Sequence, residues 1–161
     1  IDGALGTEQA QEIVEYVVEK IRNYAGGLVI ATRDTHEDNY LETSEGRHLP
    51  VPHCIRGTKG WEIRAEVADA LHKVNAEIIN KPTFGSLDLA EKLAQMEKEE
   101  ELEIELAGLC TDICVVSNAL LIKAKLPEVV MKVDSSCCAG VTPESHKAAL
   151  LTMKMCQIEV L

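Results

Sequence analysis

The sequence predicts an α/β protein with a three-layer, doubly wound parallel sheet, and two observations lead to that fold class. Short apolar runs of strand length, such as 28–32, alternate along the whole chain with segments of helical periodicity. Continuously apolar strands are typical of a parallel sheet with both faces covered, and strict alternation implies right-handed crossover connections. Because functional residues of such sheets gather at the carboxyl ends of the strands, the search for a site begins there.

The first elements are a helix, a strand and a long loop. A helix is expected over about 8–24, with Thr7 as its N-cap and apolar residues at helical spacing, namely Ile13, Val14, Val17, Val18 and Ile21. Gly26-Gly27 ends it, and the strand 28–32 follows. Residues 33–60 contain Gly and Pro but little periodicity, and a loop of that length inside one domain is usually functional.

Four further strands and the helices between them complete the prediction. The last helix begins at Thr142-Pro143-Glu144, where proline at the first position and an acid in the first turn are typical of a helix start. The elements are expected at about 61–71 (helix), 76–80 (strand), 87–98 (helix), 102–107 (strand), 112–125 (helix), 129–133 (strand), 142–156 (helix) and 157–161 (strand).

Composition and charge limit the function. The 161 residues are enough for one domain, and 16 Lys+Arg against 27 Asp+Glu give a net charge of −11. This acidic balance argues against nucleic acid and anionic membranes as partners, and no apolar run reaches the roughly 20 residues that span a bilayer. The six cysteines are expected to be reduced thiols of a cytoplasmic protein, because the chain can form a core without a disulfide framework.

The long loop carries a candidate metal site. Asp34 and His36 directly follow the first strand, and His48 and His53 come later in the same loop. A carboxylate and several imidazoles at a strand end suit a divalent ion with nitrogen and oxygen ligands, and alternate residues of extended chain project to the same side. The alternative is that Asp34 caps a turn and the histidines are ordinary surface residues.

Two other strand ends carry a lysine and a cysteine. Lys81 follows the second strand, and in an apolar environment it could lower the pKa of a neighbouring thiol. Segment 108–115 passes from a strand into a helix and puts Cys114 in the first turn, where the dipole and free N–H groups favour a thiolate and could hold an oxyanion. The alternative is that Cys110 and Cys114 are inert packing residues.

Together these segments resemble the isochorismatase-like cysteine hydrolases, and within them the nicotinamidases. The motifs behind the resemblance occur in the family's order and span most of the chain: Thr32-Arg33-Asp34-Thr35-His36, Pro52-His53-Cys54, Gly57-Thr58-x-Gly60, Lys81, 108–115 and Ala139-Gly140-Val141. The segment around Cys114 is the most specific of them, and Lys81 gains its meaning from the others.

The resemblance implies a six-stranded parallel sheet and a catalytic Asp–Lys–Cys triad. In it Cys114 is the nucleophile, and Lys81 stabilises its thiolate. The backbone N–H groups of Cys110 and Cys114 would form the oxyanion hole, with a cis peptide expected at Leu109-Cys110.

The resemblance also implies a divalent metal. Three positions match the metal ligands of nicotinamidases: Asp34, His36 and His53. Glu45 has a plausible spacing for the fourth ligand, with Glu42 and His48 as rivals. Zinc is the expected metal, with iron and manganese as alternatives, and in nicotinamidases it binds the pyridine nitrogen and so orients the ring.

Two features depart from the family's pattern. The triad aspartate lies in an N-terminal strand that would end just before Ile1, so the single domain 1–161 is expected to lack that strand and to retain five. Several nicotinamidases carry an aromatic side chain just before the Pro-x-His-Cys-like segment, where residues 49–52 here read Leu-Pro-Val-Pro. Phe84 is the candidate replacement in the substrate pocket, with Leu109 as a second pocket residue.

The expected function is a metal-assisted cysteine amidase that converts nicotinamide or a related carboxamide into the acid and ammonia. Its partner would be that small molecule, and a homo-oligomer is usual in the family. One alternative is a metal-free relative that acts on another amide or on an enol ether, as isochorismatases do. The other is a non-catalytic protein that keeps the fold for partner binding, if the chain truly begins at Ile1.

Overall fold

The fold is an α/β arrangement of five strands whose pairs are all parallel, as the sequence predicts. A computed structural model describes residues 3–25 and 27–161. The strands are β1 (Ile30–Asp34), β2 (Glu77–Lys81), β3 (Glu103–Leu109), β4 (Val130–Ala139) and β5 (Glu159–Val160). They form two sections, β1-β2 and β3-β4-β5.

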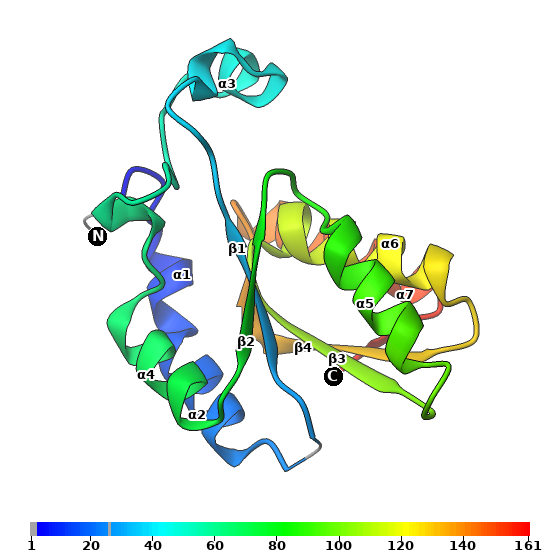
Figure 1. The fold of residues 1–161 in the computed structure, drawn as a ribbon. Coiled ribbons are helices and arrows are strands. Elements are labelled where there is room, and N and C mark those ends of the chain that lie inside the picture. Colours follow the sequence, from blue (N-terminus) through cyan, green and yellow to red (C-terminus); the bar gives the residue numbers. More distant parts are fainter. Residues whose placement is uncertain (1–2, 26) are drawn as a thin grey trace.

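Helices cover the sheet on both faces (Figure 1). One layer contains α1 (Glu8–Glu12), α2 (Val14–Asn23) and α4 (Ala65–Lys73), and the other contains α5 (Leu87–Met96), α6 (Val116–Lys125) and α7 (Pro143–Met155). The three-layer, doubly wound architecture is therefore confirmed. None of the described helices is long and apolar enough to cross a membrane.

Two predicted helices differ from the observed ones. The helix expected over 8–24 is interrupted at Ile13, which ends α1 and precedes α2, whereas its predicted N-cap Thr7 does accept a hydrogen bond from the N–H of Ala10. Gly26, expected to end this helix, lies outside the described residues. The helix expected from residue 61 begins only at Ala65, because the indole N–H of Trp61 is held by the Thr35 hydroxyl and the chain stays extended beyond it.

The strands end later than the apolar runs indicate. The strand expected at 28–32 is β1, which extends to Asp34, and the strand expected at 129–133 is β4, which continues to Ala139. A register shift in the β3–β4 pairing between Leu106 and Gly108 accompanies this extension. The added residues are mostly polar or small, so hydrophobicity alone does not mark them as strand.

The core lies between the sheet and the layer α5–α7. Its most deeply buried members are aliphatic or methionine side chains, among them Ile122, Met131, Val133, Met153 and Ile158. Burial of such side chains contributes about 1.5–3 kcal/mol each. This layer therefore anchors α6, whose N-terminal end carries the cysteine turn.

A groove separates the two sections of the sheet. Among the described residues β1 pairs with β2 and β3 pairs with β4, so the facing edges of β1 and β3 have no strand between them. The groove has a volume of about 660 Å³, and β1, β3, α2 and α5 contribute to its walls. Its lining mixes apolar side chains, such as Leu93 and Ile104, with Lys20 and Glu105.

The register of β1 and β2 brings two predicted site residues together. The pairing runs from Ile30 opposite Glu77 to Asp34 opposite Lys81. Both residues therefore lie at the carboxyl edge of the sheet, where parallel α/β proteins bind their ligands.

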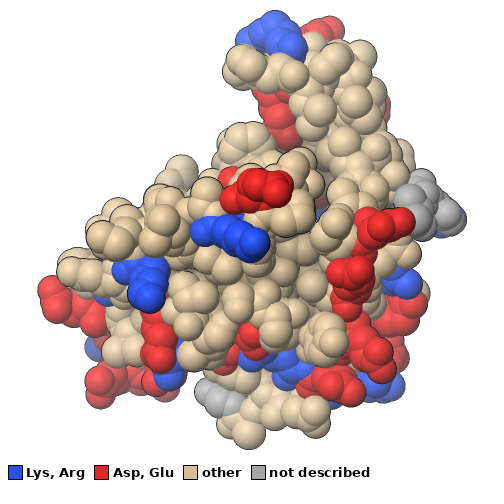
Figure 2. All heavy atoms as spheres, turned by 180° about the vertical axis from the view of Figure 1, so that it is seen from behind, with Lys and Arg blue, Asp and Glu red and all other residues tan. Residues whose placement is uncertain are grey.

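The long loop is more structured than expected. It contains two short 3₁₀ helices, Tyr40–Glu42 and Lys59–Trp61, and the helix α3 (Ser44–His48). The segment around α3 projects above the rest of the molecule (Figures 1 and 2). On the face in Figure 2, acidic and basic side chains are interspersed, with no single basic patch.

Candidate active site

The cysteine turn begins where β3 ends. The peptide bond Leu109-Cys110 is cis, as the resemblance implies. A single π-helical turn, Thr111–Val115, follows, and the carbonyl of Cys110 accepts hydrogen bonds from the N–H groups of Ile113 and Val115. This turn holds Cys114 at the carboxyl edge of the sheet with 9% of its surface exposed.

Lys81 and Asp34 lie directly against the Cys114 thiol. The ammonium of Lys81 is 3.2 Å from Sγ of Cys114, and it forms an ion pair with the Asp34 carboxylate. The Asp34 oxygens are 3.5 and 3.8 Å from the same sulfur. Lys81 is only 2% exposed, and it also donates to the carbonyl of Thr83 at 3.1 Å. A buried, well-partnered ammonium beside a thiol is an arrangement that favours the thiolate once it forms.

Burial and the neighbouring carboxylate disfavour the charged form of the Cys114 thiol. Burial raises the pKa of Cys114 to about 12, and the negative charge of Asp34 adds to that effect, while Lys81 opposes it. For Lys81, burial by itself would lower the pKa, but the hydrogen bond to Asp34 and the negative charges of a Cys114 thiolate and of the Asp34 carboxylate outweigh it, so the pKa is raised. The helix start, which favours a thiolate, is therefore opposed here by burial and by the charge of Asp34.

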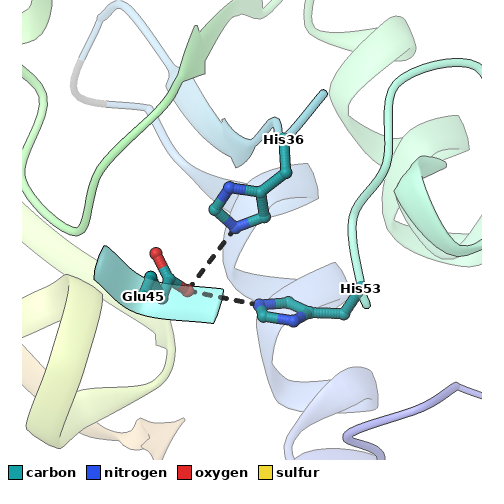
Figure 3. Close-up of side chains that lie close together, drawn as sticks. All are labelled: His36, Glu45 and His53. Carbon is teal, nitrogen blue, oxygen red and sulfur yellow. Dashed lines mark ion pairs between the residues drawn. The ribbon is translucent and has the colours of Figure 1, made fainter. Parts of the chain in front are cut away.

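The loop after β1 brings His36, Glu45 and His53 together (Figure 3). Oε1 of Glu45 is 3.5 Å from Nε2 of His36 and 3.5 Å from Nε2 of His53. Nδ1 of His53 is bonded to the carbonyl of Val51 at 2.8 Å, which leaves Nε2 aimed at the cluster. Such a bond on the second ring nitrogen is typical of metal-bound histidine.

The cluster fits a divalent ion. His36 is 8% exposed, and its Nε2 is buried without a hydrogen-bond partner, which is costly unless something binds it. Ligand bonds of about 2.0–2.1 Å in a tetrahedron imply ligand atoms about 3.4 Å apart, close to both separations. Tyr40, 1% exposed, packs its ring about 5 Å from both imidazoles and donates its hydroxyl to the carbonyl of Leu49.

The structure separates the predicted ligands into two groups. Within the described chain, the cluster close enough to share one ion consists of His36, Glu45 and His53. Asp34 faces Lys81 and Cys114 instead, so its place as a ligand stays a prediction. Of the rivals to Glu45, both Glu42 and His48 are exposed, and Nδ1 of His48 is bonded to the carbonyl of Ser44.

A cavity of about 200 Å³ opens onto the cysteine site. Its lining includes Leu109, Asp34, Lys81 and Cys114, together with Cys54, which directly follows His53 in the long loop. Phe84, the other predicted pocket residue, is 44% exposed and does not line this cavity.

Two residues that the sequence interpretation did not single out also line this cavity. The Arg33 guanidinium lies 3.5 Å from the ring centroid of Trp61. The sequence could have indicated Trp61 as a site residue, because it directly follows the Gly57-Thr58-x-Gly60 motif.

Asn118 connects the cysteine turn to the loop after β2, and the sequence interpretation missed it. It is 5% exposed and uses both ends of its amide. Its Oδ1 accepts from the N–H of Ser86, and its Nδ2 donates to the carbonyls of Phe84 and Cys114. It lies four residues after Cys114, about one helical turn further along the chain, so its position in the sequence carried a usable signal.

The fold and these contacts define a class: a doubly wound α/β protein with a cysteine, a lysine and a carboxylate together at the sheet edge, an arrangement typical of a cysteine hydrolase. The family model described as the isochorismatase domain matches residues 1–161. The chain belongs to the isochorismatase family, and the predicted resemblance is confirmed.

Several known proteins are similar to the chain over most of their length. The Bacillus subtilis (strain 168) protein described as "Uncharacterized isochorismatase family protein PncA" is 28% identical over 92% of this chain and 80% of its own. The crystal structure of nicotinamidase/pyrazinamidase PncA from Bacillus subtilis has a TM-score of 0.80 at 25% identity and covers 95% of this chain and 86% of its own. The pyrazinamidase of Pyrococcus horikoshii, solved in complex with zinc, has a TM-score of 0.77 at 25% identity over 99% and 89%. These similarities support an amide hydrolase of the nicotinamidase type.

Proposed function

We propose that this protein is a metal-assisted cysteine amidase that hydrolyses nicotinamide or a related carboxamide to the acid and ammonia. The observation that carries the proposal is the 3.2 Å contact between the buried Lys81 ammonium and the Cys114 sulfur at the carboxyl edge of the sheet. The nicotinamidase and pyrazinamidase structures that resemble the chain support an amide as the substrate.

The reaction would proceed through a thioester on Cys114. The sulfur attacks the carboxamide carbon as its proton passes to a carboxylate, and the Lys81 ammonium stabilises the developing thiolate. The backbone N–H groups of Cys110 and Cys114 receive the negative oxygen of the tetrahedral intermediate. The C–N bond breaks as the nitrogen takes up a proton, and ammonia leaves. Water then hydrolyses the thioester, which releases the acid and returns the proton to sulfur.

Two carboxylates are candidates for the proton acceptor. Asp34 lies 3.5 Å from the Cys114 sulfur and already accepts the Lys81 ammonium. The family resemblance assigns this role to an aspartate on a strand that precedes the present β1. The groove between β1 and β3, with an unpaired strand edge on each side, is a fitting place for that strand.

His36, Glu45 and His53 would hold the metal, with zinc as the expected ion. The orphaned Nε2 of His36 and the spacing of the three side chains support this assignment. When bound there, a divalent ion supplies a Lewis acid for the nitrogen of a pyridine ring. The six free cysteines support a cytoplasmic location, and a homo-oligomer stays a prediction.

An ammonia-release assay tests the proposal. The chain, and the chain with any residues that its gene encodes ahead of Ile1, are supplied with nicotinamide, pyrazinamide and aliphatic amides in the presence of Zn²⁺, Mn²⁺ or Fe²⁺. We expect release from the pyridine or pyrazine carboxamide, and none from a Cys114→Ala variant of either form.

Mass spectrometry during turnover supplies a second readout. An adduct of the acyl group on the peptide that contains Cys114 is expected after rapid acid quenching. Undiminished ammonia release by Cys114→Ala would refute the nucleophile. Turnover of an enol ether, with no amide accepted, would instead support the isochorismatase-type alternative.

A further inference from the structure

The first turn of α7 packs against the turn that carries the cysteine, although more than 25 residues separate them in the sequence. Two consecutive side chains of the cysteine turn, Thr111 and Asp112, are both bound there. Neither contact belongs to the predicted triad, the oxyanion hole or the metal cluster. Their position makes them candidates for holding the reactive turn in place.

The contact of Thr111 is buried. Thr111 has no exposed surface, and its Oγ1 is 2.8 Å from Nδ1 of His146. Thr111 lies between Cys110 and Cys114, the two residues whose N–H groups are proposed to bind the oxyanion. A buried hydroxyl without a hydrogen-bond partner is unfavourable, because it has lost its contact with water and gains nothing in return. The bond to His146 therefore constrains the position of the turn.

The backbone geometry keeps His146 close to the turn. A Cβ atom on Gly140 would lie 2.9 Å from Cβ of His146 and 3.0 Å from its backbone atoms, so only glycine allows this approach. Asp112 adds a second tie, since it accepts from the N–H of Val141 at 3.0 Å and from the Ser145 hydroxyl. Ser145 is also part of the capping box of α7, so the hydrogen bond to Asp112 comes from a side chain that the start of α7 already holds in place.

We propose that His146 is a positioning residue for the nucleophile turn, acting through its hydrogen bond to Thr111. This inference rests on the proposed amidase function. The imidazole holds Thr111 in place, and Thr111 fixes the N–H groups of Cys110 and Cys114 around the point where the substrate oxygen becomes negative. His146 does not itself line the cavity at Cys114 within the described chain, so it does not act on the substrate directly.

Kinetics of matched variants test the role. Because small displacements of catalytic groups can cost up to about 100-fold in rate, we expect His146→Ala to lower kcat at least about tenfold with KM changed by less than about threefold. His146→Asn places an amide near the position of Nδ1, so its kcat should return to within about threefold of the wild type. His72→Ala, which removes an exposed imidazole from α4, is the control and should leave both constants unchanged.

A double-mutant cycle tests the route through Thr111. Thr111→Val should reproduce the loss in kcat, and the double variant with His146→Ala should be no slower than the slower single variant. Additive losses would overturn the proposal. So would a His146→Ala variant that lowers the melting temperature but keeps kcat.

A readout without turnover separates this inference from the proposed function. If wild type and His72→Ala release no ammonia from any carboxamide, the amidase proposal fails, and His146 is judged by iodoacetamide labelling of Cys114, mapped by mass spectrometry. A rate changed at least about threefold in His146→Ala and restored in His146→Asn supports positioning. An unchanged rate overturns it.

Discussion

The ion-pair network around Lys20 gives a quantitative test of the structure. Lys20 of α2 is 2.7 Å from Oδ2 of Asp134 on β4, and it also pairs with Glu105 on β3. The Asp134 side chain is 15% exposed. Burial alone would raise the pKa of Asp134, but the Lys20 pair and the hydrogen bonds from Ser136 more than offset that, and the pKa is lowered to about 2.

The perturbation is Asp134→Asn, which keeps the shape and an acceptor for Ser136 but removes the charge. A shift from the usual 3.8 to about 2 corresponds to about 2 kcal/mol of folding free energy, at about 1.4 kcal/mol for each pKa unit. Because the pKa is lower in the folded state, this contribution is complete above about pH 4 and is lost as the pH falls toward 2. The variant should therefore be less stable by about 2 kcal/mol at pH 7 and approach the wild type near pH 2.

Urea unfolding followed by circular dichroism at pH 7, 5, 4 and 3 measures this difference. Asp69→Asn is the control, because Asp69 is exposed and pairs with Lys73 on the surface, where ion pairs contribute little. A difference for Asp134→Asn that stays constant from pH 7 to pH 3 would refute the reasoning. So would a change in Asp69→Asn of the same size and pH dependence.

Three further predictions concern the site and its support. His36→Leu should abolish stoichiometric metal binding, measured by elemental analysis after dialysis against zinc, whereas His48→Ala should keep it; equal metal contents would contradict the assignment. Asn118→Leu should lower the free energy of unfolding by about 2–4 kcal/mol, measured in urea, because it leaves buried backbone groups without partners, and a loss below about 1 kcal/mol would argue against this. Gly140→Ala should destabilise by about 1–3 kcal/mol because its Cβ meets the α7 backbone, while Gly60→Ala, whose nearest neighbour would be 3.9 Å away, should be neutral in the same thermal unfolding assay.

Local patterns were sufficient for the fold class and for placing the candidate residues Asp34, Lys81 and Cys114 at strand ends, whereas their roles were implied by the resemblance to a family. Apolar runs mark β1 and β2, and the residues at their ends, Asp34 and Lys81, follow from the rule that parallel strands present their carboxyl ends at one edge. The helix start after β3 identifies Cys114 in the same way. These features depend on spacing along a few residues, which a sequence displays directly.

Features that depend on tertiary contacts were not predictable. The sequence favours Glu45 as the fourth ligand but leaves Glu42 and His48 as rivals, because what separates them is the orientation of α3 within the loop, and no periodicity encodes that orientation. The side of the site that Asp34 faces is decided by its attraction to the Lys81 ammonium. The bond between Thr111 and His146 joins residues 35 positions apart, so it becomes visible only once α7 is placed.

The β1–β2 register has a consequence for how activity is acquired during folding. Since side chains alternate along a strand, a slip of β2 by one residue would put Asn80 opposite Asp34 and turn Lys81 toward the other face of the sheet. A chain mispaired in this way could still bury much of its apolar surface, but it would have no ammonium beside the thiol. Activity therefore requires correct strand alignment, and the yield of active enzyme after refolding cannot exceed the fraction of correctly paired molecules.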